Sequence, residues 1–324
     1  MTLPRPRDLA AFWLLSILWS GNWLLINVGL EGLPPFRFAG LRMALASLLL
    51  AAFVLRRPRP SVTAGQARAI ALIGFLQIGV SYACVFTAEQ WIDSGLTALL
   101  FSSFAIWVAV LGHFLLDGEP LTARTVAATV AGIAGVAVIE GPALARAGSV
   151  PAGPLALGGS LVLVSAIVSA LSAVIVKKRL ARVSSVASVW GQSLVAALVL
   201  LGAASVFERG TPSRWTSGAV FALAYLALVG TFTFLGSQWL IPRLPVAVVG
   251  TFPILNTLLA LLWGSLLGHE RITARALTGG ALILGGVVIV TFRRGVAPAR
   301  TPGNVRIQTR PRMQSVRPAD SSKG

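Results

Sequence analysis

The chain contains ten long apolar segments, and the short stretches between them hold most of its charges. A helix needs about 20 mostly apolar residues to cross the hydrocarbon core of a bilayer. Within lipid, such a helix satisfies all its backbone polar groups internally. We therefore predict an all-α polytopic membrane protein with ten transmembrane helices, at residues 9–27, 36–55, 69–88, 96–116, 125–139, 155–176, 186–207, 217–241, 246–267 and 276–292.

Composition supports a membrane protein and argues against several other classes. Of the 324 residues, 56% are hydrophobic and 11% are charged, whereas about a quarter of the residues of a soluble domain are charged. The net charge of +17 comes from Lys and Arg clusters between apolar segments, so we expect no nucleic-acid partner. Cys84 is the single cysteine, and His113 and His269 have no ligand partners at helical spacing. We therefore expect no disulfide, metal site or cofactor.

The distribution of Lys and Arg predicts the orientation, because cytoplasmic loops of membrane proteins are enriched in both. If residues 1–8 are cytoplasmic, the cytoplasmic segments hold 20 of these residues and the outer loops hold five. Without the polar, basic tail at residues 294–324, which we expect to be disordered, the numbers are 12 and five. We predict a multi-pass protein of the cell (inner) membrane with both termini in the cytoplasm.

A short phrase occurs twice, as GEPLTAR at residues 118–124 and as GHERITAR at residues 268–275. When Glu119 is aligned with Glu270, Gly135 falls on Gly286. The phrase lies at the same position in each half, and each half would contain five helices. Because five is an odd number, the second half would enter the membrane in the opposite sense, as in inverted-repeat transporters. We predict two five-helix repeats, at residues 9–141 and 152–293. Within the phrase, we expect the two Glu residues to act as acidic caps of the short helices that follow, with Thr122 and Thr273 as further caps.

These features together resemble the EamA family of the drug/metabolite transporter superfamily. The resemblance rests on the 5+5 arrangement, on LPPFRFAGLRM at the second helix, and on the repeated phrase before the fifth and tenth helices. It implies a transporter whose central cavity is lined mainly by helices 1, 3, 4, 6, 8 and 9, with helices 5 and 10 at the periphery. One departure is Pro253 in TFPILN, where the first half has Ser102.

Polar residues inside the predicted helices are candidates for the substrate site, because such residues are costly in a membrane. Arg42 is the only Arg well within a segment; its guanidinium would bind a carboxylate or phosphate, or alternatively backbone carbonyls. Asn22 follows Gly21, and Asn256 lies three residues after Pro253, which frees a carbonyl near residue 249. For both amides, a substrate contact and an interhelical hydrogen bond remain open. Gln77 is a further polar candidate in the third segment.

Aromatic residues supply the other candidates. Trp19, Tyr82, Phe101 and Trp107 lie within predicted helices and would suit an apolar or aromatic substrate, although ordinary packing or lipid contact is the favoured role of each one taken singly. No Asp or Glu lies at the centre of a segment, so a carboxylate of the kind used in proton coupling is missing.

The favoured function is a carrier that moves a small organic metabolite, an amino acid or a related or drug-like compound, outward by alternating access. A channel or a non-transporting membrane receptor is the alternative. We expect no enzymatic activity, because the polar residues include no pairing of a nucleophile with a base. Helices rich in Gly and Ala would serve a homodimer contact or internal packing alike.

Overall fold

A computed structural model describes residues 5–55, 62–92, 94–139, 141–148, 152–267 and 273–291. Throughout these residues the regular elements are helices, as predicted. They are α1 (Pro6–Trp19), α2 (Asn22–Leu30), α3 (Pro35–Leu55), α4 (Ala64–Ile73), the π-helix η1 (Gly74–Val80), α5 (Ser81–Ala88), α6 (Ser94–Phe101), α7 (Phe104–Leu115), α8 (Ala123–Ile139), α9 (Gly141–Ala147), α10 (Ala152–Arg179), α11 (Ser185–Phe207), α12 (Ser217–Leu240), the 3₁₀ turn η2 (Ile241–Arg243), α13 (Val246–Leu267) and α14 (Ala274–Thr291). The predicted tail, residues 294–324, lies outside the described residues.

Seven helical segments of the described chain are long and apolar enough to cross a membrane. Three shorter apolar helices, Ala123–Ile139, Val246–Leu259 and Leu277–Ile289, coincide with the remaining predicted segments. Large apolar side chains cover the outer surface, and those of Leu48, Leu198 and Phe221 are more than half exposed. Such a surface is suited to lipid. The polytopic all-helical membrane protein is therefore confirmed, whereas the number of ten transmembrane helices stays a prediction.

Two of the predicted segments are broken near their middle. The first divides into α1 and α2 at Ser20, and the fourth divides into α6 and α7 at Ser102. At both breaks the serine hydroxyl donates to the carbonyl three residues earlier, at 2.7 Å for Ser20 and 2.6 Å for Ser102. A hydroxyl that competes for a helical carbonyl bends a helix. The two breaks bring four helix ends into the interior of the bundle.

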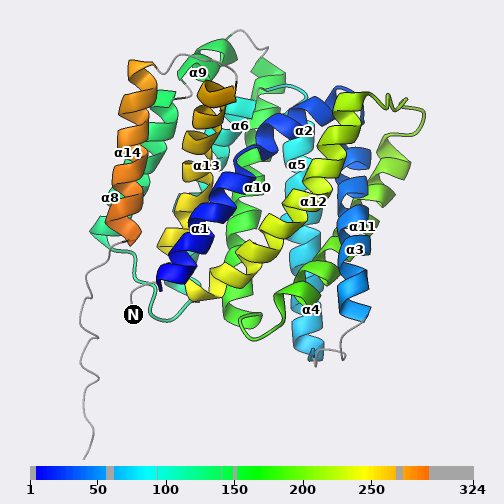
Figure 1. Cartoon of the computed structure of the whole chain (residues 1–324), viewed down its shortest axis with the longest axis horizontal. Helices are drawn as coiled ribbons and strands as arrows, with labels where there is room; N and C mark the ends of the chain where they lie inside the picture. Colours follow the sequence, from blue (N-terminus) through cyan, green and yellow to red (C-terminus); the bar gives the residue numbers. More distant parts are fainter. Residues whose placement is uncertain are drawn as a thin grey trace, which may run out of the picture.

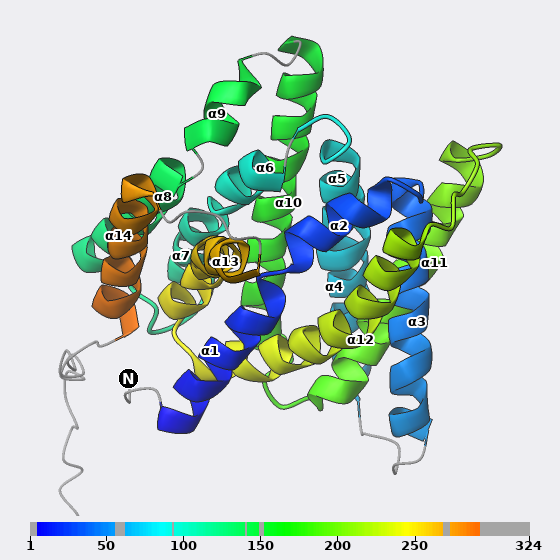
Figure 2. The ribbon, with the colours of Figure 1, turned by 45° about the horizontal axis from the view of Figure 1, so that its top comes forward.

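The helices pack in pairs that join the two halves of the chain. The two most extensive contacts are between α8 and α14 and between α3 and α11, and these pairs form opposite edges of the bundle (Figure 1). Further contacts join α5 to α10 and join α1 and α2 to α12. In Figure 2, α13 lies near the middle, between the two edges.

Backbone contact holds the α8–α14 edge together. A Cβ atom added to Gly135 would lie 2.6 Å from the carbonyl oxygen of Gly279, and one added to Gly279 would lie 2.6 Å from the carbonyl oxygen of Gly135. Any larger residue at either position would push the helices apart. Small residues at a contact allow this close approach between membrane helices.

We call the end of the bundle where α1 begins the proximal end, and the end where α2 finishes the distal end (Figure 1). At the proximal end, Thr122 caps α8 as predicted, since its hydroxyl accepts from the N–H of Thr125 at 3.2 Å. The prediction that Glu119 caps the same helix is wrong. Its carboxylate instead lies 3.4 Å from the N–H of Val246 at the start of α13 and 2.7 Å from Lys177 Nζ. Glu270 lies outside the described residues.

Candidate functional site

A cavity of about 140 Å³ lies in the interior, between helices of both halves. We call it the central cavity. A cavity of about 150 Å³ accommodates benzene, so this conformation has room for a small organic molecule. It is lined by Phe12, Trp19, Asn22, Ile26, Arg42, Gln77, Ser81, Tyr82, Val85, Phe86, Phe101, Phe104, Ser169, Ala173, Phe234, Ser237, Leu240, Ile241, Leu244, Val249, Phe252, Pro253 and Asn256.

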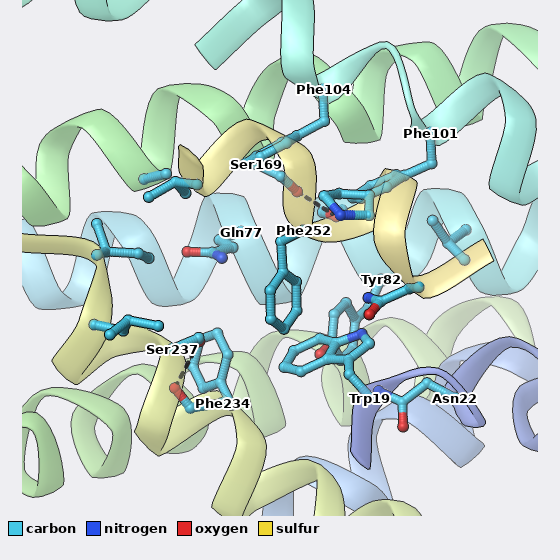
Figure 3. Close-up of a pocket in the computed structure, with 18 of the residues that line it drawn as sticks. Trp19, Asn22, Gln77, Tyr82, Phe101, Phe104, Ser169, Phe234, Ser237 and Phe252 are labelled. Atoms are coloured by element: carbon cyan, nitrogen blue, oxygen red, sulfur yellow. Dashed lines mark hydrogen bonds between the residues drawn. The ribbon is translucent and has the colours of Figure 1, made fainter. Parts of the chain in front are cut away.

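The helix breaks place side chains at this cavity. Trp19 ends α1 and Asn22 begins α2, while Phe101 ends α6 and Phe104 begins α7. In the view of Figure 3, Phe252 lies between Gln77 on one side and Trp19 and Tyr82 on the other. The Phe252 ring packs edge-on against Trp19, with 5.7 Å between the ring centroids. The interruptions of the first and fourth segments therefore supply aromatic walls.

Three amide side chains of the lining carry oxygens without a hydrogen-bond partner. These buried atoms are Asn22 Oδ1, Gln77 Oε1 and Asn256 Oδ1. Gln238 lies outside the lining; its amide nitrogen donates to Gln192 Oε1 at 3.5 Å, and its own Oε1 is likewise buried without a partner. Buried polar atoms in proteins are normally partnered. The three lining amides are therefore available to accept hydrogen bonds from a ligand.

Arg42 of α3 also faces the cavity, and it is 2% exposed. Its guanidinium carbon lies 5.0 Å from the centre of the Tyr82 ring, a cation–π contact. Its Nε is buried without a hydrogen-bond partner. Among the described residues that line the cavity there is no Asp or Glu, so these residues do not balance the positive charge of Arg42.

A cluster of hydroxyls forms part of the same wall. Ser81 Oγ lies 2.6 Å from Ser165 Oγ and 3.1 Å from Ser169 Oγ. The cluster joins α5 to α10 immediately after the π-helix η1. Because these hydroxyls satisfy one another, we read the cluster as a link between helices of the two halves.

Seven of the eight side chains selected from the sequence lie together at the central cavity. Trp107 does not line it, and instead packs in a neighbouring apolar cluster that includes Phe104 and Val108. The seven that do line it are Trp19, Asn22, Arg42, Gln77, Tyr82, Phe101 and Asn256.

Sequence reasoning missed five aromatic residues of the lining, which are Phe12, Phe86, Phe104, Phe234 and Phe252. Phe252 had a usable signal, because it precedes the helix-interior Pro253 that was singled out. The other four are ordinary apolar residues in apolar helices, and only their neighbours in space distinguish them.

Other titratable residues lie outside the central cavity. His113 is exposed at the end of α7, where its Nδ1 accepts from the N–H of Leu121 at 3.3 Å. Glu89 follows the last residue of α5, and both its carboxylate oxygens are buried without a partner. Burial raises the pKa of Glu89 well above its ordinary value. Among the described residues, no three His, Cys, Asp or Glu side chains gather in a way that would hold a metal ion.

Comparisons with known proteins agree with this architecture. The chain is 27% identical over 281 residues to the uncharacterized transporter YoaV of Bacillus subtilis, covering 86% of this chain and 94% of that protein. It is 26% identical to the uncharacterized inner membrane transporter YedA of Escherichia coli K12, covering 90% and 92%. It is 29% identical to a probable amino-acid metabolite efflux pump of the same organism, covering 86% and 93%.

A crystal structure with 21% sequence identity shares the fold, with a TM-score of 0.72 over 89% of this chain and 97% of that one. The sequence profile of the EamA-like transporter family matches residues 8–141 and, separately, residues 156–292. Together these matches span most of the chain, including every segment that lines the central cavity. The chain therefore belongs to the EamA-like transporter family.

Proposed function

We propose that this protein is a carrier of the inner membrane that moves a small organic metabolite, an amino acid or a related compound, out of the cell. The observation that carries the proposal is the central cavity, which is enclosed by helices from both halves and combines aromatic walls with unpartnered amides. Apolar pockets with a few convergent polar groups are typical of small-molecule sites.

The mechanism we propose is alternating access by two inverted five-helix halves, at residues 9–141 and 152–293. Support comes from the helix pairing, because α3 with α11 and α8 with α14 are corresponding helices of the two halves. The contact of α5 with α10 likewise corresponds to that of α12 with α1 and α2. A site between two such halves is exposed to one side and then the other as they rock. In this proposal the proximal end and both termini face the cytoplasm.

Efflux and the substrate class draw on the relative named as a probable amino-acid metabolite efflux pump. The cavity supports a small substrate, since its volume of about 140 Å³ admits little more than a benzene-sized molecule. A larger, drug-like compound would require the walls to move apart.

Counterflow in proteoliposomes tests the carrier. Vesicles loaded with an unlabelled amino acid should take up the same labelled compound saturably, and faster than unloaded vesicles do. A channel would give flux that does not depend on internal substrate, and a receptor would give none.

Paired variants connect this flux to the cavity. Asn22→Leu removes an unpartnered amide of the lining, and we expect flux to fall about tenfold, the effect of losing roughly one good hydrogen bond. Asn27→Leu is the matched control, because Asn27 lies on the same helix outside the lining. Equal flux in both variants and the wild type would show that the substrate does not pass through the central cavity.

A further inference from the structure

Arg42 occupies an environment that opposes its charge. It lies near the middle of α3, a helix of 21 residues, and it is one of the largest fully buried side chains of the described protein. Burying a guanidinium normally requires a carboxylate or several hydrogen-bond acceptors, because the lost hydration must be replaced. An ionisable group of this kind inside a membrane helix points to a functional partner.

The described protein supplies neither a carboxylate nor a hydrogen bond to Arg42. No ion pair or hydrogen bond joins the guanidinium to any described residue, and Nε is buried without a partner. The carboxylates of Glu119 and Glu208 are engaged at opposite ends of the bundle. Glu89 lies beyond Phe86 at the end of α5 and is not part of the lining. The guanidinium of Arg42 therefore belongs to the wall of a cavity whose described lining contains no acidic side chain.

Two neighbours hold the guanidinium in place without neutralising it. Tyr82 presents its ring to one side, at 5.0 Å. On α12, a Cβ atom added to Gly230 would lie 2.7 Å from Nη2 and 3.4 Å from Cζ. The glycine thus makes room for the guanidinium, while the ring supports it by a cation–π contact. A fixed planar fork of N–H donors is suited to binding a carboxylate through two parallel hydrogen bonds.

The remaining polar atoms of the lining complement such a ligand. The unpartnered oxygens of Asn22, Gln77 and Asn256 accept hydrogen bonds and carry no charge. They would receive an ammonium or hydroxyl group, while the aromatic walls would surround the carbon skeleton. A cation without a carboxylate would find the same amide oxygens, but the positive charge of Arg42 would repel it.

We propose that Arg42, seated between Tyr82 and Gly230, is an anion site of the central cavity, and that the transported molecule carries a carboxylate that binds there. The inference rests on the carrier function proposed above and adds the charge of its substrate. It predicts that small carboxylates bind, that their amides do not, and that a simple inorganic anion binds weakly at the same place.

Thermal unfolding of the purified protein tests the site without knowledge of the physiological substrate. The probes are chloride, compared between the wild type and the variants at equal ionic strength, and three compounds of one carbon skeleton, L-alanine, L-lactate and L-alaninamide. A ligand that binds only the folded state raises the melting temperature by mass action. We expect chloride, alanine and lactate to stabilise the protein and alaninamide to leave it unchanged.

Variants assign the effect to Arg42. In Arg42→Gln the apparent affinity for the three stabilising probes should fall about tenfold or more, as expected when a charge-assisted pair is lost. Arg68→Gln removes an exposed Arg of α4 and should behave like the wild type. If Arg42→Gln fails to fold, Gly230→Ala is the second variant, since it displaces the guanidinium and keeps its charge. Gly202→Ala is its control, because a Cβ atom there meets nothing within 4 Å.

Anion stabilisation that is lost in Arg42→Gln or Gly230→Ala, and kept in the two controls, would support the site. Equal stabilisation by alanine and alaninamide, or anion effects that persist in both cavity variants, would overturn it. The two proposals fail separately. Saturable counterflow of compounds that lack a carboxylate would support the carrier function and refute the anion site. Anion binding through Arg42 without any counterflow would support the anion site and refute the carrier function.

Discussion

Glu119 and Glu208 use the same chemistry at opposite ends of the bundle. At the proximal end, Glu119 lies 3.4 Å from the N–H of Val246, the first residue of α13. At the distal end, Glu208 accepts from the N–H groups of Phe36 and Arg37 at 2.6 and 2.9 Å, at the start of α3. A carboxylate is favourable at both places because it satisfies free N–H groups and complements the helix dipole.

The difference lies in what else each carboxylate holds. Glu119 also pairs with Lys177 of α10 at 2.7 Å, and Lys177 donates to the carbonyl of Leu244, which lines the central cavity. Glu208 fastens α3 to α11, a pair already in extensive contact at the edge of the bundle. The proximal contact therefore ties α10 to a residue of the cavity wall, whereas the distal contact reinforces an edge. The two carboxylates therefore cap helices in the same way but connect different parts of the bundle.

The largest expected effect is that of Glu119→Gln. The side chains of Glu119 and Lys177 are 5% and 18% exposed, so the variant leaves a largely buried ammonium without its carboxylate. We expect a loss of about 3 kcal/mol in unfolding free energy, measured by denaturation in detergent. The double variant Glu119→Gln/Lys177→Met should recover part of this loss, because it removes the unpaired charge. A single variant as stable as the wild type would contradict the pairing.

The same variant should open the proximal side of the cavity. In a Cys84→Ser background, a cysteine in place of Leu244 reports access to the cavity through its rate of alkylation. Glu119→Gln should increase that rate, and Glu208→Gln should not. Equal rates in the two variants would mean that the proximal contact does not control access.

Glu89 is expected to give an effect of opposite sign, because this third carboxyl group has no partner. Leaving a buried polar group unpartnered costs roughly 1–3 kcal/mol, so Glu89→Met should raise the unfolding free energy by about 1 kcal/mol at neutral pH. The pKa of Glu89 is raised by burial, so the wild type loses stability as the pH rises from the ordinary carboxyl pKa towards the raised one. The gain should therefore be larger at pH 7.5 than near pH 4. A gain that does not depend on pH would refute this.

Glu208→Gln is expected to have the smallest effect, a loss of about 1 kcal/mol, since an amide oxygen still accepts one hydrogen bond and only the helix-end charge is lost. Thermal unfolding of Glu208→Gln and Glu119→Gln, measured in parallel, compares the loss of stability in the two variants. A loss as large as that of Glu119→Gln would show that the two ends are equally important to stability.

Much of the helical architecture was predictable, because the length and apolar composition of each segment favour a membrane helix whatever the rest of the fold. The segment predicted at residues 36–55 is α3, and the one at 186–207 is α11, each within one residue. The breaks at Ser20 and Ser102 were not predicted, since a serine is also compatible with a continuous helix. The partner of Glu119 was mistaken because Val246 is 127 residues away in the chain. Gly118 has a φ of 77° and forms the turn between α7 and Glu119, and residues 119–122 then run without regular structure to the start of α8.

For the candidate site, the sequence identified unusual residues but not their neighbours. Arg42, Asn22 and Asn256 stand out because polar groups are costly within apolar helices. Such a residue can be recognised from the sequence of its own segment alone. Phe104 and Phe234 resemble other apolar residues of their helices until the fold places them at the cavity, and Trp107 resembles them until it is placed outside.

The sequence by itself determined the membrane class, the helical segments, the repeated phrase and the resemblance to the EamA family, because these depend on local composition and spacing. Only the tertiary structure decided that Arg42 has no acidic partner among the described residues, that Gly230 leaves room for its guanidinium, and that Glu119 caps α13. These are relations between residues on different helices, and packing between helices sets them.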